Sequence, residues 1–579
     1  MTNRETHTGL SGAITALTAP GAAFEMRTVE VQGQPCRVFC NGPQTLSEVY
    51  RGAATHAQRT LTVLDDQHMS YAQVMGKAAA LGQFLAQQVD GPSLRGQRIA
   101  IVMSNRPEWL IAFIAITAAG ATAVLVNSRG TAAEIAAALD ESDSVMVLAD
   151  ERRAQLMAEG EVCRPMIVVR EAETGSVASV DRIDFSAATR GWETAQLQPV
   201  TVQPDDEALV MFTSGTTGNP KAALFSHRGV LMGLMHIQLS GALVAPHILA
   251  RRGADAFAGA ANHQPAALLA FPLFHVSGCY AVFLSSLMRG GRIVILPKWD
   301  GATALTLIER ENIASFSGAP AMYWDMLRQD HSARSFKSLL SVGAGGQAFA
   351  PTLYKDIEAA FPLAVLGVGY GMTECGGTVC TIAGEELVSH VTASGRVFPS
   401  VDVRIVDDQD LDVPTGERGE ILMRGAMLMR EYCKQPQATA LVLQDGWLRT
   451  GDIGRIDADG YLHVVDRKKN IVISGGENIS CNEVEAAVME HGSVAETAAF
   501  SVPDERLGEA LVVAVVLLAG KALTQEALQI HLCERLAAYK VPRRVVFLDA
   551  MPRNATEKVM RHALRSQFLG HIEAAIGVA

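Results

Sequence analysis

The first half of the chain alternates short, wholly apolar runs with longer stretches of helical periodicity. Residues 98–103 (RIAIVM) predict a β-strand, and residues 105–120 predict the helix that follows it. Residues 121–127, 131–142 and 145–150 repeat the order strand, helix, strand. Apolar strands without polar alternation, separated by helices, are typical of a parallel sheet that is covered on both faces.

The helix over 105–120 has recognisable ends. Asn105 is the predicted N-cap, Pro107 lies in the first turn, and Gly120 closes the helix. Residues 110–126 form a long, uncharged and mostly apolar run, which falls short of the roughly 20 residues that a membrane span needs. We interpret it as a buried helix followed by a buried strand, and we expect no transmembrane segment.

The same alternation resumes after residue 207. Three of the later strands run directly into loops rich in glycine or hydroxyl groups, at 213–218, 343–347 and 369–374. Open parallel sheets bind ligands beyond the carboxyl ends of their strands, so these loops are predicted to converge on one crevice. The strands are predicted at 208–215, 267–274, 292–297, 314–320, 339–346 and 364–374.

From about residue 401 the pattern changes to short strands, with a hairpin turn predicted at Asp459-Gly460. Beyond Arg467 a smaller α+β unit is predicted, with helices near 482–490 and 524–536 and a strand at 511–518. Residues 1–43 lack periodicity and are predicted to be a peripheral extension.

Composition narrows the class of protein. A chain of 579 residues with 49% apolar and 19% charged residues is globular and long enough for two or three domains. The net charge of −12, with no run of Lys and Arg that suggests a basic groove, argues against nucleic-acid binding. Nine scattered cysteines supply no CxxC pair for zinc, and the N-terminus lacks a secretory signal, so we expect a cytoplasmic protein.

The loop TSGTTGNPK, residues 213–221, combines hydroxyls, glycines and a lysine directly after a predicted strand. Backbone N–H groups and hydroxyls in such a loop can form an anion-binding concavity, although a polar surface loop has the same composition. The Walker pattern requires Ser or Thr after the lysine, and here Ala222 follows Lys221.

Eight blocks in order resemble the adenylate-forming (AMP-binding) superfamily, in its acyl-CoA synthetase or carboxylate–CoA ligase branch. The resemblance covers about residues 44–570. The blocks are TSGTTGNPKAALFSH, FPLFHVSG, GAGGQAF, GYGMTE, RTGDIG, DRKKN, SGGEN and PRNATEKV. The resemblance implies that a carboxylic acid attacks the α-phosphate of ATP, with Mg²⁺, and that the acyl group then passes to CoA.

The resemblance also implies where the nucleotide binds. Tyr370 offers a ring for adenine to stack on, and Asp452 can accept from both ribose hydroxyls, with Arg467 nearby. Taken alone, Asp452 could equally be a turn residue. The β- and γ-phosphates are assigned to Thr213, Ser214, Gly215, Thr216, Thr217, Gly218 and Lys221. The adenine side also includes Gly345, Gly346, Gln347 and Gly371.

Four residues are implied in catalysis. Thr373 donates to the α-phosphate, Glu374 holds Mg²⁺, and Lys558 is the adenylation lysine. His275 is placed near the substrate carboxylate, with no role in proton transfer. Without their motifs, Glu374 and Lys558 would be read as solvated charges and His275 as a packed residue.

The predicted acyl pocket has few large side chains, which favours a medium-chain, long-chain, aromatic or bulky acid over acetate. Fatty, aromatic and polycyclic acids all remain open. The lining residues are Phe274, Ser277, Ala281, Gly343, Gly369, Cys375, Gly376 and Gly377.

The fold class implied is α/β, with a large N-terminal domain of doubly wound sheets and a β-rich subdomain, followed by a small mobile α+β domain. The predicted parts are an extension (1–43), an adenylation domain (44–467) and a C-terminal domain (468–579). The resemblance places the hinge at Lys469, which could otherwise be a linker charge. It places Gly475, Gly476 and Glu477 on the CoA side.

The sequence departs from the family pattern in three places. Glu557 precedes the adenylation lysine where the family usually has Gly, and Ala222 follows the phosphate loop where Gly is common. Cys481 and Asn482 stand where a Pro-containing stretch often follows SGGEN. Glu557 puts the geometry of its loop in question, but not the identity of the lysine.

Several alternatives remain at this stage. They are an adenylating enzyme that loads a carrier protein, a luciferase-like oxygenase and a non-catalytic nucleotide-binding regulator. The sequence ends without a carrier-like segment, which disfavours a modular synthetase. Retention of Lys558, Glu374 and Asp452 together disfavours the regulator. A homodimer is left open.

Overall fold

The computed structural model divides into two compact units. Unit 1 comprises Met1–Gly346, Ile357–Val403 and Met423–Leu448, and unit 2 comprises Gln347–Asp356, Arg404–Leu422 and Arg449–Ala579. The predicted boundary at residue 467 stays a prediction. The residues described are 10–88, 93–170, 182–198, 200–213, 220–254, 263–332, 334–345, 351–474, 477–504, 506–554 and 558–576.

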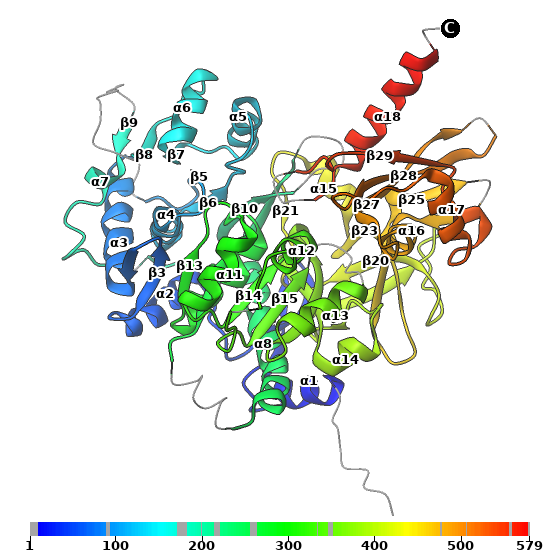
Figure 1. The fold of residues 1–579 in the computed structure, drawn as a ribbon. Coiled ribbons are helices and arrows are strands. Elements are labelled where there is room, and N and C mark those ends of the chain that lie inside the picture. The colour runs from blue at the N-terminus through cyan, green and yellow to red at the C-terminus, as the bar shows by residue number, and fades with distance from the viewer. Residues whose placement is uncertain are drawn as a thin grey trace, which may run out of the picture. The chain divides into compact units, whose positions relative to one another are not determined.

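The first sheet of unit 1 has eight strands in the order β21-β11-β10-β6-β5-β7-β8-β9 (Figure 1). From β10 to β9 all neighbours are parallel, while β11 pairs antiparallel with both β10 and β21. The strands are β5 (Arg98–Val102), β6 (Thr122–Leu125), β7 (Met146–Asp150), β8 (Met166–Val169), β9 (Arg182–Asp184), β10 (Glu207–Phe212), β11 (Ala222–Ser226) and β21 (Glu431–Tyr432). The predicted parallel sheet is confirmed.

Helices accompany this sheet where the periodicity predicts them. The helix α4 (Pro107–Ala118) is buried along nearly its whole length, and Gly120 takes a φ of 82° just beyond its end. Glycine adopts this left-handed conformation without steric cost, so it ends the helix as predicted. The other helices are α3 (Tyr71–Gln88), α5 (Ala132–Glu141), α6 (Glu151–Glu159) and α7 (Phe185–Ala188).

Asn105 does not cap α4, which is a correction to the sequence analysis. The N-cap is Arg106, whose side chain makes no capping hydrogen bond. The Asn105 amide is instead used in a tertiary contact: Nδ2 donates to the carbonyl of Phe271 and Oδ1 accepts from the N–H of Leu273, both at 2.9 Å. Asn105 therefore fixes the start of the FPLFHVSG block.

The second sheet has nine strands in the order β18-β17-β16-β15-β14-β12-β13-β3-β4. Its central strands are parallel, and β17 and β4 are antiparallel to their neighbours. The strands are β3 (Thr60–Leu64), β4 (Gln67–Ser70), β12 (Ala266–Leu269), β13 (Arg292–Ile295), β14 (Ser315–Gly318), β15 (Ser341–Gly345), β16 (Val365–Met372), β17 (Gly377–Ala383) and β18 (Arg396–Val397). The loop after β10 thus leaves one sheet, while those after β15 and β16 leave the other.

The helices of the second half of unit 1 include one π-helix, Ser277–Leu284, directly after His275. The longest, α8 (His227–Arg252), is long and apolar enough to cross a membrane by length and composition alone. Residues such as Leu231, Leu234 and Leu239 are buried within unit 1, as in the core helix of a globular domain. The others are α10 (Ser285–Arg289), α11 (Gly301–Arg310), α12 (Pro320–Leu327), α14 (Gly384–Ser389) and α15 (Pro436–Val442). The helix α13 (Pro351–Ala360) is divided between the two units, with residues 351–356 in unit 2 and residues 357–360 in unit 1.

Part of the predicted N-terminal extension has regular structure that the sequence analysis did not foresee. It contains α1 (Leu10–Thr18) and a hairpin of β1 (Met26–Val31) and β2 (Gln34–Phe39), followed by α2 (Leu46–Ala53). Val38 and Phe39 are buried, and Arg37 forms an ion pair with Asp402. These residues pack as part of unit 1.

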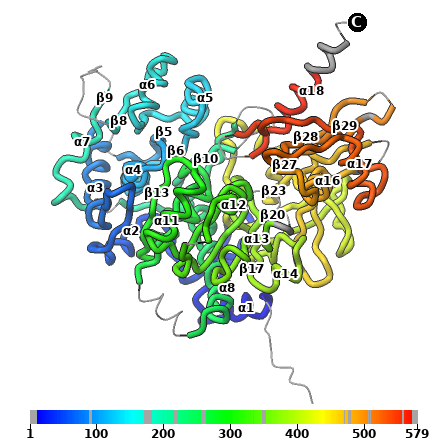
Figure 2. The backbone as a smooth tube through the Cα atoms, in the orientation of Figure 1, coloured from blue at the N-terminus to red at the C-terminus, as the bar shows by residue number. Residues whose placement is uncertain are grey.

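Unit 2 contains a five-stranded sheet in the order β26-β25-β28-β27, with β29 parallel to β28, drawn in orange and red in Figure 2. Leu528 and Leu532 are buried in one apolar cluster and Leu564 in another, so helices contribute to two separate cores. The elements are β25 (Ile471–Ser474), β26 (Glu477–Ser480), α16 (Cys481–Met489), β27 (Val494–Asp504), β28 (Gly508–Leu517), α17 (Gln525–Cys533), β29 (Arg544–Phe547) and α18 (Arg561–Ile576).

A further sheet forms the predicted β-rich part, in the order β19-β20-β23-β22 with β24 beside β23. The turn between β23 and β24 contains Gly460 at a φ of 83°, so the predicted hairpin is confirmed. The strands are β19 (Asp402–Val406), β20 (Gly419–Arg424), β22 (Leu443–Gln444), β23 (Trp447–Ile456) and β24 (Leu462–Arg467).

Candidate active site

The predicted phosphate loop connects two antiparallel strands, β10 and β11, in unit 1. The N–H of Thr213 donates to the carbonyl of Lys221 at 2.9 Å, so these two residues face each other at the base of the loop. Ser214, Gly215, Thr216, Thr217 and Gly218 lie outside the described residues. The loop therefore connects the two strands of a β-hairpin, whereas a Walker loop connects a strand to a helix.

The base of this loop carries charges of both signs. The Nζ of Lys221 lies 4.9 Å from the ring centroid of Tyr432. The carboxylate of Glu141 accepts from the N–H of Ala222 at 3.0 Å and from Nε2 of Gln435 at 2.6 Å. Burial raises the pKa of Glu141, and its hydrogen bonds and Lys221 oppose that rise.

The GYGMTE block occupies the end of β16 and a following 3₁₀ turn, Thr373–Cys375. Gly371 faces the carbonyl of Gly377 so closely that an added Cβ would lie 1.7 Å from that oxygen. Only glycine fits there, and this close approach sets the path of the chain into Thr373 and Glu374. Tyr370, the predicted adenine contact, is half-buried on the same strand.

Glu374 is held by hydrogen bonds at both its side chain and its backbone. Its Oε1 accepts from the hydroxyl of Tyr432 at 2.8 Å, and its carbonyl accepts from the N–H of Met429 at 2.9 Å. Magnesium is usually bound by one or two carboxylates together with substrate phosphates and water. The Glu374 carboxylate fits such a donor set, because the Tyr432 hydroxyl bonds to Oε1 and not to Oε2.

The predicted acyl side brings together two blocks that are distant in the sequence. Gly377 lies next to Val276 and Tyr280, the atoms nearest to an added Cβ there being 3.8 and 4.0 Å away. Gly376 lies close to the helix α8. A Cβ added to Gly233, which is on α8, would lie 2.2 Å from the carbonyl oxygen of Gly376. Buried Phe274 and half-buried His275 and Ser277 lie in FPLFHVSG, and half-buried Ala281 follows that block. Buried Cys375 directly follows GYGMTE.

Gly343 and Gly369 lie on the neighbouring strands β15 and β16, where Gly345 pairs with Gly369. The carbonyl of Gly343 accepts from the hydroxyl of Tyr323 at 2.5 Å. Gly346 and Gln347 lie outside the described residues.

Sequence reasoning missed Tyr280 and Tyr432. Tyr280 is fully buried beside Gly377, and its hydroxyl has no hydrogen-bond partner among the described residues. Tyr280 lies between Ser277 and Ala281, two residues predicted to line the acyl pocket, so its place in the sequence could have suggested it as a further pocket residue. Tyr432 lies outside the eight blocks, and only the fold brings it to Glu374.

In unit 2, Asp452 and Arg467 form an ion pair across the strands β23 and β24, with Nε and Oδ1 3.2 Å apart. The Asp452 side chain is 3% exposed and that of Arg467 is 41% exposed. The backbone N–H of Asp452 donates to Oγ1 of Thr450 at 3.0 Å. The two residues predicted at the ribose are therefore adjacent.

The other predicted site residues of unit 2 lie in three separate segments. Lys558 closes a loop with Asn554, because the Lys558 N–H donates to Asn554 Oδ1 at 3.0 Å and the Asn554 N–H donates to the Lys558 carbonyl at 2.9 Å. Lys469 lies in the 3₁₀ helix Lys468–Asn470. Glu477 begins β26, opposite Ser474 on β25, while Gly475 and Gly476 lie outside the described residues.

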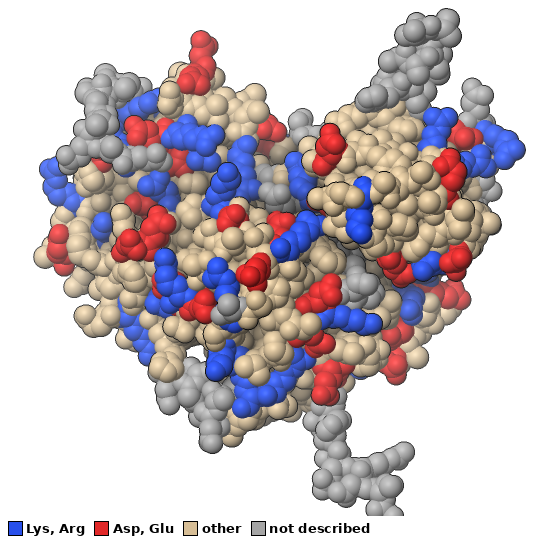
Figure 3. All heavy atoms as spheres, viewed as in Figure 1, with Lys and Arg blue, Asp and Glu red and all other residues tan. Residues whose placement is uncertain are grey.

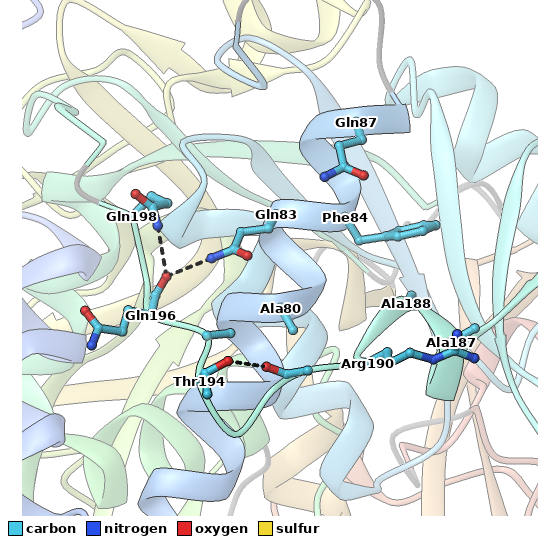
Figure 4. Close-up of a pocket in the computed structure, with 12 residues that line it drawn as sticks. Ala80, Gln83, Phe84, Gln87, Ala187, Ala188, Arg190, Thr194, Gln196 and Gln198 are labelled. Atoms are coloured by element: carbon cyan, nitrogen blue, oxygen red, sulfur yellow. Dashed lines mark hydrogen bonds between the residues drawn. The ribbon is translucent and has the colours of Figure 1, made fainter.

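A separate groove of about 460 Å³ lies between α3 on one side and α7 with the segment that follows it on the other (Figure 4). Gln83 and Gln198 both donate to the carbonyl of Gln196 within it, at 3.2 and 3.5 Å. Its lining includes Arg190 but none of the predicted site residues that the structure describes.

In the face that Figure 3 shows, Lys and Arg are interspersed with Asp and Glu.

The comparisons with known proteins agree with this arrangement. Residues 49–433 match the family model described as AMP-binding enzyme, and residues 483–558 match the AMP-binding enzyme C-terminal domain. The chain is 32% identical over 539 residues to the methyl-dioxo-octahydro-indenyl-propanoyl:CoA ligase of Rhodococcus jostii, covering 90% of this chain and 98% of that one. It is 31% identical over 513 residues to the long-chain-fatty-acid–CoA ligase FadD13 of Mycobacterium tuberculosis, covering 87% and 94%.

A solved structure extends the comparison to a bound intermediate. The o-succinylbenzoate CoA synthetase MenE of Bacillus subtilis, in complex with its acyl-adenylate intermediate, has a TM-score of 0.72 and 27% identity, covering 89% of this chain and 97% of that one.

The AMP-binding match and the CoA-ligase relatives define an enzyme of the acid–thiol, AMP-forming ligase class. The chain belongs to the family of AMP-binding enzymes.

Proposed function

We propose that the enzyme adenylates a medium-chain, long-chain, aromatic or otherwise bulky carboxylic acid and then transfers the acyl group to CoA. The observation that carries the proposal is the extent of the match: the chain covers 98% of a CoA ligase at 32% identity. The adenylation lysine, the metal carboxylate and the ribose carboxylate of the family pattern are retained as Lys558, Glu374 and Asp452.

In the first half-reaction the carboxylate attacks the α-phosphate of ATP and pyrophosphate leaves. Bound Mg²⁺ would neutralise phosphate charge as it develops. Lys221 and the hydroxyls of the loop hold the β- and γ-phosphates, and Thr373 donates to the α-phosphate. Lys558 offsets the negative charge that accumulates as two anions meet. Tyr370 and Asp452 hold the adenosine.

In the second half-reaction the CoA thiol attacks the acyl carbon and AMP leaves. The Gly475-Gly476 loop and Glu477 form the CoA side after the small domain rotates about Lys469. This rotation is part of the proposal.

The proposal is tested by two measurements on the purified protein. Pyrophosphate release that depends on a carboxylic acid separates a ligase from a nucleotide-binding regulator. Thioester formation with free CoA then separates a CoA ligase from an enzyme that loads only a carrier protein. A screen of AMP release across fatty, aromatic and polycyclic acids identifies the class of acid.

We expect Glu374→Gln to reduce acid-dependent pyrophosphate release by on the order of a hundredfold, because glutamine keeps the size of the side chain but removes the charge that holds Mg²⁺. Glutamine can still accept from the Tyr432 hydroxyl, so the midpoint of thermal unfolding should change little. Release at the wild-type rate would remove Glu374 from the metal site.

We also expect the specificity constant to increase from acetate to octanoate. Burial of each CH₂ contributes roughly 0.8 kcal/mol while the pocket has room. The prediction rests on the small side chains that follow His275 and Glu374 in the sequence, and buried Tyr280 lies beside Gly377. The measurement is kcat/KM for straight-chain acids of increasing length. A decrease along this series would contradict the prediction.

A further inference from the structure

Tyr432 connects two parts of the nucleotide site that are far apart in the sequence. It lies on β21, which pairs antiparallel with β11, the strand that follows the phosphate loop. Its hydroxyl donates to Oε1 of Glu374 at 2.8 Å, and its ring lies 4.9 Å from Nζ of Lys221. The residue itself is only 4% exposed.

The backbone around Tyr432 is fixed on both sides. The N–H of Met429 donates to the carbonyl of Glu374 at 2.9 Å, and that of Cys433 donates to the carbonyl of Ala222 at 2.8 Å. The N–H of Tyr432 donates to Oγ1 of Thr439 at 2.9 Å. The ring therefore has a defined position relative to both Glu374 and the end of the phosphate loop.

We propose that Tyr432 is a positioning residue that orients the Glu374 carboxylate toward the metal and keeps Lys221 available for phosphate. This inference rests on the proposed function. It adds a role for a residue outside the eight motif blocks.

The chemistry of a tyrosine suits both tasks. A neutral hydroxyl donates to one carboxylate oxygen without cancelling the negative charge, so Oε2 of Glu374 keeps its full capacity to bind a cation. The face of the ring attracts the Lys221 ammonium but does not neutralise it. A direct ion pair between Lys221 and Glu374 would instead satisfy each charge with the other.

The test is the affinity for Mn²⁺, used as a paramagnetic substitute for Mg²⁺, in the presence of a non-hydrolysable ATP analogue. Free Mn²⁺ is measured by electron paramagnetic resonance. Tyr432→Phe keeps the ring over Lys221 and removes only the hydroxyl. We expect it to weaken Mn²⁺ binding about tenfold, the size of one hydrogen bond to a charged group.

Tyr71→Phe is the matched control. The Tyr71 hydroxyl is also buried and donates to the backbone carbonyls of Ser286 and Gly291, at 3.1 and 2.7 Å. Its loss should lower the midpoint of thermal unfolding without changing Mn²⁺ affinity. As a second measurement, Tyr432→Phe should have no further effect on Mn²⁺ binding when Glu374→Gln is already present, because the two residues act through one contact.

Unchanged Mn²⁺ affinity in Tyr432→Phe would overturn the inference, and so would an equal loss in Tyr71→Phe. If the wild-type protein makes acyl-adenylate and binds Mn²⁺ with the analogue, either result refutes only the role of Tyr432. If the wild-type protein does neither, the proposed function fails and this inference fails with it.

Discussion

Replacing Asp452 by alanine is expected to reduce acyl-adenylate formation about a hundredfold or more while the protein remains folded. The reason for the loss is that one carboxylate accepts from two ribose hydroxyls, and each hydrogen bond to a charged group contributes about 1.5–3 kcal/mol. The reason for the retained fold is that Arg467 is 41% exposed, so water can solvate its charge after Asp452 is gone. The measurement is acid-dependent pyrophosphate release under single-turnover conditions.

Asp457 provides a matched control on the same hairpin. Its carboxylate contacts Nε2 of His463 at 2.7 Å and accepts from the N–H groups of Asp459 and Tyr461 in the turn. Asp457→Ala should lower stability and leave the rate of adenylate formation unchanged. Asp452→Ala at the wild-type rate, or equal losses in both variants, would show that Asp452 does not bind the ribose.

The elements that could be predicted are those whose own residues determine them. The strands β5, β6 and β7 are continuous apolar runs, and such runs are stable only when both faces of a sheet are covered. Gly120 and Gly460 both adopt positive φ, which few other residues do readily. These signals are local, and the structure agrees with them.

The features that could not be predicted depend on contacts between distant residues. The hairpin of β1 and β2 shows no apolar alternation strong enough to be recognised, and one of its contacts is the ion pair of Arg37 with Asp402. The side chain of Asn105 could cap a helix, but residues 271–273 use its hydrogen bonds.

The same holds within the candidate site. The motif blocks indicate Glu374 and Lys221, whereas the tyrosine between them is found only because β21 pairs with β11. The π-helix Ser277–Leu284 has the composition of an ordinary helix. Its Gly278 lies so close to Pro272 that an added Cβ would be 2.3 Å from that carbonyl oxygen. Local sequence contains no signal for such a contact.

The two lysines of unit 2 are expected to separate the half-reactions. Lys558→Ala should reduce adenylate formation on the order of a hundredfold, because its ammonium offsets the charge of the carboxylate meeting the α-phosphate. The same variant should convert supplied acyl-adenylate and CoA to thioester at the wild-type rate, because under the proposed rotation its loop has left the reacting atoms by then.

Lys469→Pro is expected to have the opposite effect. Lys469 lies in the 3₁₀ helix Lys468–Asn470, and residues in such a helix have φ near −50° to −70°. Proline fixes φ near −65° and so permits this conformation while resisting a change to another. The variant should therefore form adenylate and fail to form thioester. Lys469→Ala, which removes the charge but leaves the backbone free to rotate, is the control and should retain both steps.

Paired single-turnover assays distinguish these outcomes, one starting from acid and ATP and the other from synthetic adenylate and CoA. A hinge requires that Lys469→Pro lose only the second step and that Lys469→Ala lose neither, since the hinge acts through φ and not through charge. Equal loss of both steps in Lys558→Ala and Lys469→Pro would contradict the rotation for this chain. Retention of adenylate formation by Lys558→Ala would instead indicate that Glu557 has changed what its neighbouring lysine does.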